Sequence, residues 1–171
     1  MSRDLKRVKT EKGKSSEAWG SIVPLWKAVW QWAVFYLAIR MPVPWKAWWY
    51  GKTGINMGKG VQIMPLVTTD IFFPNLISIG DNSVIGMDSI IICHEFTVDE
   101  FKYGPVKIGK NVLIGAKAFI LPGVTIGNGA IVSAQTVVYK DVPANTIAFG
   151  SPMQFKLIET KIEDKNKQKK K

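Results

Sequence analysis

The sequence is poor in the residues from which many enzyme sites are built. Its 171 residues include one cysteine, Cys93, and one histidine, His94. A single cysteine excludes an internal disulfide framework and fits a reducing compartment, and we expect Cys93 to be a small buried residue. Zinc sites take three or four suitable ligands, so we expect no metal site unless copies of the chain pool their ligands. The sequence also contains no glycine-rich phosphate loop and no serine nucleophile elbow.

Acidic residues are also few, with 13 Asp and Glu against 23 Lys and Arg, for a net charge of +10. Most of the excess lies in two tails, because residues 1–14 and residues 161–171 each hold six basic and two acidic residues. The remaining body is nearly neutral, which argues against a nucleic-acid partner. We interpret residues 1–18 as a disordered basic tail, and residues 151–171 as a C-terminal cap followed by a second basic tail. Attraction of the tails to an anionic membrane is the alternative.

All seven tryptophans lie between residues 19 and 49. Within this segment, residues 25–41 predict an apolar helix flanked by prolines, and a second short aromatic patch follows at residues 45–50. The helix is shorter than the roughly 20 residues that span a bilayer, and no signal-peptidase site follows it. Two main interpretations of residues 19–52 stay open: a cap that packs on the protein or a neighbouring subunit, and an anchor at the membrane interface. A single membrane span is a third.

Branched aliphatic residues recur every six positions through the rest of the chain, in two phases. The first phase contains Ile55, Val61, Val67, Phe73, Ile79, Ile85 and Ile91, and the second contains Ile108, Ile114, Ile120, Ile126, Val132 and Val138. Ile and Val make up about a fifth of the chain, yet they occupy all but one of these positions.

Such a period is typical of a β-solenoid, in which each repeat is one short strand and a turn. We therefore predict an all-β solenoid over residues 53–150, with a cap at each end because open coils leave unpaired strand edges. Glycine follows the repeated aliphatic residue five times, and we attribute these glycines to the backbone freedom that corners require. They are Gly80, Gly86, Gly109, Gly115 and Gly127.

The repeat is interrupted between Ile91 and Ile108, where polar and aromatic residues surround His94. Loops that leave a regular scaffold often carry function. Imidazole can accept a hydroxyl proton near neutral pH, and Glu95 is close to His94 in sequence. We therefore predict an active-site loop over residues 92–107.

The hexad pattern, the His-bearing loop and three later motifs resemble the hexapeptide-repeat acyltransferases. The motifs are VKIGKNVLIGA (106–116), LPGVTIG (121–127) and YKDVP (139–143). The chain is most similar to the maltose, galactoside and colanic-acid O-acetyltransferase branch, in a form with a hydrophobic N-terminal segment. The resemblance implies a left-handed parallel β-helix with three hexads per coil, a homotrimer, and acetyl-CoA bound between two subunits.

The resemblance also implies roles for particular residues. His94 corresponds to the general base that takes the proton of the acceptor hydroxyl, and Glu95 is expected to orient its imidazole. Ala116 and Ala134 correspond to small residues beside the pantetheine arm of the cofactor. Lys140 corresponds to a basic residue near the adenosine phosphates.

Some positions depart from the family pattern. The chain has Tyr139 where the family often has Thr, and Gln154 where it often has a basic residue. Two expectations stay open: the phosphate contact passes to Lys156, or the chain binds the cofactor weakly. No polar residue matches the acceptor-binding position of the sugar acetyltransferases. Asp70, a carboxylate among apolar early repeats, is our candidate for that role, and a solvent-exposed turn residue is the equal alternative.

We therefore predict an acetyl-CoA-dependent O-acetyltransferase that acts on a hydroxyl of a sugar or sugar-containing acceptor. The alternatives are transfer of a longer acyl chain, transfer to an amine, and a catalytically decayed scaffold recruited to membranes. We expect a cytoplasmic protein, peripheral on the inner face of the cell membrane if residues 19–50 contact lipid. In that case the acceptor would be lipid-linked or part of an envelope glycan.

Overall fold

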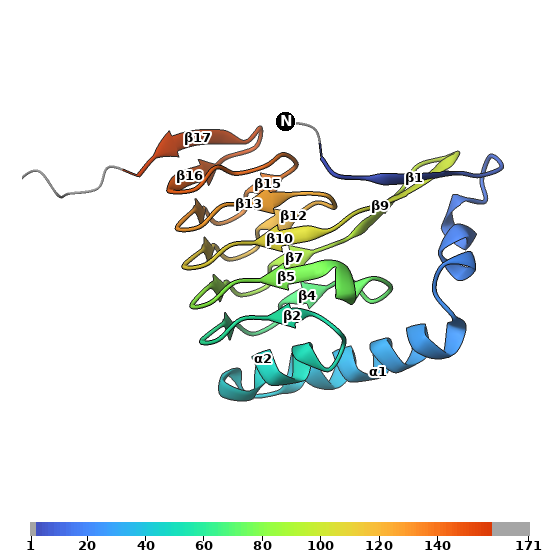
Figure 1. Ribbon diagram of the computed structural model, residues 1–171, viewed down its shortest axis with the longest axis horizontal. Helices are drawn as coiled ribbons and strands as arrows, with labels where there is room; N and C mark the ends of the chain where they lie inside the picture. Colours follow the sequence, from blue (N-terminus) through green and yellow to red (C-terminus); the bar gives the residue numbers. More distant parts are fainter. Residues whose placement is uncertain (1–2, 159–171) are drawn as a thin grey trace, which may run out of the picture.

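A computed structural model describes residues 3–158, which form a stack of short strands with two helices across one end (Figure 1). The second basic tail lies outside the described residues. Most strands are only two or three residues long, as the six-residue period predicts.

Three parallel sheets build the stack, and the chain places one strand in each sheet before it returns to the first. The first sheet contains β2 (Asn56–Met57), β5 (Ile77–Ile79), β10 (Val106–Ile108) and β13 (Thr125–Ile126). The second contains β3 (Gln62–Ile63), β6 (Val84–Ile85), β11 (Leu113–Ile114), β14 (Ile131–Val132) and β16 (Thr146–Phe149). The third contains β4 (Thr68–Thr69), β7 (Ile90–Ile91), β12 (Phe119–Ile120) and β15 (Val137–Val138). One coil is therefore three strands and three corners.

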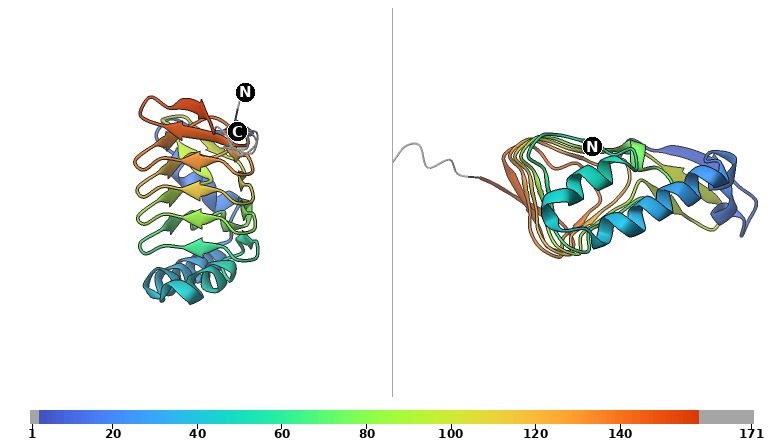
Figure 2. Two further views of the ribbon diagram at one scale, coloured as in Figure 1. Left: turned by 90° about the vertical axis from the view of Figure 1, so that its left-hand side faces the viewer. Right: turned by 90° about the horizontal axis from the view of Figure 1, so that it is seen from below.

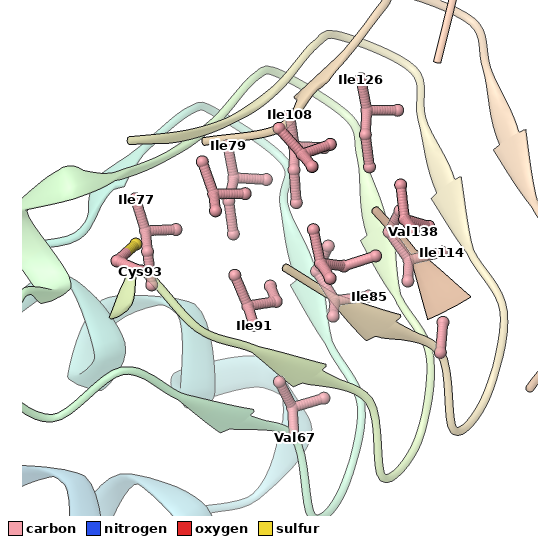
Figure 3. Packing of buried hydrophobic residues seen from close by; sticks show 14 of the residues in the cluster. Val67, Ile77, Ile79, Ile85, Ile91, Cys93, Ile108, Ile114, Ile126 and Val138 are labelled. Atoms are coloured by element: carbon pink, nitrogen blue, oxygen red, sulfur yellow. The ribbon is translucent and has the colours of Figure 1, made fainter. Parts of the chain in front are cut away.

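All thirteen repeat positions are buried, with exposed fractions between 0 and 8%. Figure 3 shows several of them, among them Ile79, Ile85 and Ile114, with their side chains inside the stack. Strand pairing aligns the positions from Ile79 onward in ladders, with Ile108 between Ile79 and Ile126 in successive coils. Ile55, Val61 and Val67 are buried but lie outside these ladders, because Met57, Ile63 and Thr69 are the partners of Ile79, Ile85 and Ile91. Each fully buried aliphatic side chain contributes about 1.5–3 kcal/mol relative to an exposed one. The predicted stack of short strands around an aliphatic core is confirmed.

The glycines after the repeat positions have a different purpose from the one we expected. None of the five has a positive φ. A Cβ added to Gly115 would lie 2.4 Å from the backbone nitrogen of Ala134, so this position needs space for the next coil rather than backbone freedom. Most of the residues with left-handed backbone at the corners are not glycines. They are Leu66, Asn82, Asp88, Asn111, Lys117, Gln135 and Asn145.

The N-terminal end of the stack is covered by α1 (Leu25–Arg40) and α2 (Val43–Gly51), which lie side by side across it (Figure 2). Two buried side chains of α2 hold this helix to α1 and to the stack. Nζ of Lys46 donates to the carbonyls of Ala38 (3.2 Å) and Ile39 (2.6 Å) at the end of α1, and burial lowers the pKa of Lys46. The hydroxyl of Tyr50 donates to the carbonyl of Val67 in the first coil, and burial raises the pKa of Tyr50.

At the other end, β17 (Gln154–Leu157) pairs antiparallel with β16 and covers the edge of the second sheet. Its backbone occupies donors and acceptors that β16 would otherwise leave open at the end of the stack. The segment after Pro152 therefore lies where a cap was expected.

The described part of the first basic segment, residues 3–18, contains a paired strand and is not the disordered tail that we expected for residues 1–18. β1 (Lys6–Lys9) pairs antiparallel with β9 (Glu100–Tyr103), which pairs in turn with β8 (His94–Phe96). The predicted loop at residues 92–107 is thus largely a hairpin whose free edge accepts a third strand. The edge supplies unpaired backbone groups for β1. Two ion pairs, of Glu100 with Arg7 and of Glu95 with Arg3, also hold the basic segment to the hairpin.

After β1 the chain forms the 3₁₀ helix η1 (Ser15–Ser21) and turns into α1. Among residues 3–158, no single helix is long and apolar enough to cross a membrane. Only η1 and α1 taken together reach that length and composition, and they meet at a bend of 102°.

Candidate active site

The corner between the third and first sheets carries the β8–β9 hairpin. His94 begins β8, which Ile92 and Cys93 separate from the strand β7 of the second coil. Asp70 directly follows β4 of the first coil at the same corner. A short 3₁₀ helix, η2 (Pro74–Leu76), turns the chain after Asp70 and leads it to β5. Stacking of two coils therefore brings together a carboxylate and an imidazole that are 24 residues apart.

The Asp70 carboxylate is fully buried and accepts four hydrogen bonds. Its Oδ2 lies 2.5 Å from Nδ1 of His94 and 2.7 Å from the backbone nitrogen of Cys93. Its Oδ1 accepts from the backbone nitrogens of Phe72 (2.8 Å) and Phe73 (2.9 Å). The carboxylate is therefore held rigidly, and it fixes the imidazole in turn.

The charge state of this pair follows from its surroundings. Burial alone would raise the pKa of Asp70, but the hydrogen bond and charge of His94, with the backbone groups of Phe73 and Cys93, hold that pKa below its ordinary value. An ionised carboxylate can only accept hydrogen bonds, so Nδ1 of His94 carries the hydrogen in the contact. In the neutral form of the ring, Nε2 then has a lone pair, which is the arrangement of a general base oriented by a carboxylate.

Aromatic rings surround the imidazole, whose side chain is 16% exposed. The rings of Phe96, Phe72 and Phe101 have centroids 5.0, 5.2 and 6.0 Å from that of His94. Trp19 of η1 stacks on Phe72 at 4.5 Å, so the N-terminal segment supports this wall. Apolar walls limit water at the imidazole and leave a reactant few directions of approach.

Glu95 does not orient the imidazole as we expected. Neighbouring residues of a strand point to opposite faces, so its side chain leaves the His94 side of β8. It instead forms a two-pronged ion pair with Arg3, with Nη1–Oε2 at 2.9 Å and Nη2–Oε1 at 3.1 Å. The orienting carboxylate is Asp70. We had two interpretations of Asp70, a residue that binds the acceptor and a solvent-exposed turn residue. Neither fits the structure, because Asp70 is buried.

The expected cofactor-binding residues lie elsewhere on the stack. Ala116 and Ala134 follow the paired strands β11 and β14, at the corner between the second and third sheets, and the nitrogen of Gln135 donates to the carbonyl of Ala116 at 2.9 Å. Ala134 is exposed and Ala116 half-buried, so they form an accessible row of small side chains. Lys140 lies 4.9 Å from the ring of Phe155, and Lys156 is exposed on β17.

Within one chain, the row of alanines and the His94 hairpin are at different corners of the coil. The structure therefore brings Asp70 to His94 but does not bring the expected cofactor residues to either.

Cys93 is fully buried. Burial, followed by the charge of Asp70, raises the pKa of its thiol, so at neutral pH it stays protonated and is a poor nucleophile. Among residues 3–158, no three His, Cys, Asp or Glu side chains are grouped so that they could hold a metal ion.

Comparisons with known proteins agree on the type of chain. Residues 105–140 match the family model "Bacterial transferase hexapeptide (six repeats)". The chain is 42% identical over 151 residues to "Putative acetyltransferase YvoF" of Bacillus subtilis, a match that covers 86% of each chain. It is 30% identical to "Putative colanic acid biosynthesis acetyltransferase WcaF" of Escherichia coli, over 76% of this chain and 83% of that protein.

A solved galactoside acetyltransferase in complex with coenzyme A is similar in structure, with a TM-score of 0.65. The likeness covers 95% of this chain and 89% of that one at 21% sequence identity. At this identity it shows a shared fold and nothing about the substrate.

Proposed function

This chain belongs to the bacterial hexapeptide-repeat acetyltransferases, and from that membership we propose that it transfers an acetyl group from acetyl-CoA to a hydroxyl of a sugar or sugar-containing acceptor. The observation that carries the proposal is the 2.5 Å contact between Nδ1 of His94 and the buried carboxylate of Asp70. The sugar acceptor is supported by the relative named for colanic acid biosynthesis. A left-handed sense of coil winding belongs to the same proposal.

In the proposed reaction, Nε2 of His94 accepts the hydroxyl proton while the acceptor oxygen attacks the carbonyl carbon of the thioester. Asp70 holds the ring and stabilises the imidazolium that forms. The tetrahedral intermediate then expels the sulfur, which takes the proton from His94, so an acetyl ester and a free thiol result. A well-oriented base contributes roughly 10²–10⁴-fold to such a step.

We further propose that a second copy of the chain, in a homotrimer, completes the site. The alanine row and the His94 hairpin occupy different corners, so the hairpin of one subunit would face the alanine row of its neighbour. The pantetheine arm would then lie along Ala116 and Ala134, where small side chains permit close approach. Lys140 and Lys156 supply positive charge for the cofactor phosphates.

The test is thiol release from acetyl-CoA over a panel of mono- and oligosaccharides, with an amino sugar included. The expected result is acceptor-dependent release and a product whose acetyl group is removed by alkaline hydroxylamine, as an ester is and an amide is not. Transfer to the amine alone would overturn O-acetylation. If the chain shows no thiol release and no acetyl-CoA binding by calorimetry, the decayed scaffold is favoured instead.

A further inference from the structure

The outer surface of the two helices that cover the end of the stack is strongly apolar. Figure 2, seen from below, shows no other element beneath α1 and α2. Nine large hydrophobic side chains on these helices are between 45% and 73% exposed, and we call them the basal face. They are Leu25, Trp26, Val29, Trp30, Trp32, Tyr36, Leu37, Trp45 and Trp48.

The α1 helix buries small side chains and exposes large apolar ones, which is the opposite of the usual arrangement. Its buried row consists of Ala28, Gln31, Val34 and Ala38, which are mostly small, whereas its largest apolar residues face outward. A helix that only capped the stack would bury its bulky apolar residues and expose its polar ones. The outward tryptophans therefore serve a contact outside this chain.

The charges of this region indicate the nature of that contact. Between Glu17 and Asp70 the sequence contains no acidic residue. Cationic side chains occur on or beside both helices, and the three outside the buried interface are Lys27, Arg40 and Lys52. Two copies that met through their basal faces would bring together like charges without an acidic partner. Phosphate groups would neutralise them instead.

Two of these cations lie directly on aromatic rings of the basal face. The guanidinium carbon of Arg40 is 3.7 Å from the centroid of Tyr36, and Nζ of Lys52 is 4.6 Å from that of Trp48. Aromatic rings with adjacent cations are typical of the bilayer interface, where rings lie at headgroup level and cations reach phosphates.

We propose that the basal face docks on the surface of a bilayer that contains anionic phospholipid. At 1.5 Å per residue, α1 is about 24 Å long, less than the roughly 30 Å of a hydrocarbon core. Its buried row and the Lys46 contacts hold it across the end of the stack, so it lies flat on the surface. Between the helices, an apolar pocket of about 360 Å³ lined by Trp30, Leu37 and Lys52 offers room for part of an acyl chain beside a cation.

Docking would bring the active site close to the headgroups. Asp70 belongs to the first coil above the helices and His94 to the second, and coils repeat at about 4.8 Å. The site then lies roughly 10 Å from the covering helices. Given the proposed acetyltransferase function, on which this consequence alone rests, the acceptor would be a sugar hydroxyl carried by a membrane lipid or an envelope glycan.

The test is flotation of the full-length chain with vesicles of phosphatidylcholine, with and without one quarter phosphatidylglycerol. We expect the native chain to float with the anionic vesicles. Joint substitution of Trp26→Ser, Trp30→Ser and Trp48→Ser should lower the bound fraction at least about tenfold. Joint substitution of Val98→Ser and Leu157→Ser, which are 62% and 74% exposed elsewhere, should leave it unchanged.

A second variant tests the charge argument. Joint substitution of Lys27, Arg40 and Lys52 by Gln should lower binding to anionic vesicles by roughly 10–100-fold while binding to neutral vesicles stays the same. Docking is overturned if the native chain stays in the soluble fraction, or if the triple-serine variant floats as well as native. Self-association that the triple-serine variant abolishes, without flotation, would instead identify a second copy as the partner. Thiol release on a soluble acceptor by this variant tests the transferase separately.

Discussion

The regular stack and the corner that carries His94 are held together by contacts of different kinds. In the stack, β11 pairs with β14 and β12 with β15 at a constant offset of 18 residues, from Leu113 to Ile131 and from Phe119 to Val137. At the corner, the contacts join His94 to Asp70, Glu95 to Arg3 and Thr97 to Ser15, which are 24, 92 and 82 residues apart. A short period can encode the first kind of contact and not the second.

This difference separates stability from chemistry. Each coil repeats the same aliphatic contacts, so the stack distributes its stability over many equivalent side chains. The corner depends on single polar contacts with no repeat. Substitutions in the stack should therefore change the free energy of unfolding, and substitutions at the corner should change the rate as well.

The largest effect on stability is expected for Ile126→Ala. This side chain is 1% exposed and lies between Ile108 and Val142 in neighbouring coils. Its truncation leaves a cavity that should lower the free energy of unfolding by about 2–5 kcal/mol, measured by urea denaturation. Thr125→Ala, on the outer side of the same strand, is the control and should change it by less than about 1 kcal/mol. Equal effects of the two would contradict the inward ladder.

A pH-dependent effect should distinguish the corner from the stack. The folded-state pKa of Asp70 lies below its ordinary value, so the unfolded chain binds more protons and stability is lost as pH falls through the folded pKa. The native chain should therefore be more stable than Asp70→Asn at pH 7, by an amount that shrinks below about pH 4. Denaturation at several pH values measures this difference. A constant difference would contradict an ionised Asp70.

The smallest effect is expected for Glu95→Gln, which breaks the ion pair with Arg3 but leaves the contact between Asp70 and His94. Partly exposed ion pairs contribute about 0–1 kcal/mol, so activity should fall less than tenfold. Arg3→Ala should give a similar value. A loss of roughly 10²-fold or more in Glu95→Gln alone would restore the role of imidazole-orienting residue that the sequence suggested for Glu95.

Sequence reasoning reached the stack and the His94 corner, because both follow from a period and its interruption. It missed Asp70 as the partner of His94, because the coil between these two residues is longer than the regular coils. Thr69 pairs with Ile91 at an offset of 22 residues, four more than in the regular coils, since η2 is inserted there. Applied to Asp70, the same offset leads to residue 92, where the predicted loop begins, two residues before His94.

The basic N-terminal segment was missed for a related reason. Its composition is that of a solvated tail, and composition does not reveal an unpaired strand edge elsewhere in the fold. Only the pairing of Val8 with Phe101 gives residues 6–9 a regular structure. The partner of the segment was itself inside the stretch that we had interpreted as a loop.

The most direct test of the central claim, that Asp70 orients His94 as the base, is a double-mutant cycle in kcat/KM. His94→Ala should lower kcat/KM by roughly 10²–10⁴-fold and Asp70→Asn by about 10²-fold. Because Asp70 acts through His94, the double variant should be no slower than His94→Ala alone. Acetyl-CoA binding by calorimetry controls for folding. If the two losses multiply, or if Asp70→Asn keeps native activity, then Asp70 does not act through His94 and the account is wrong.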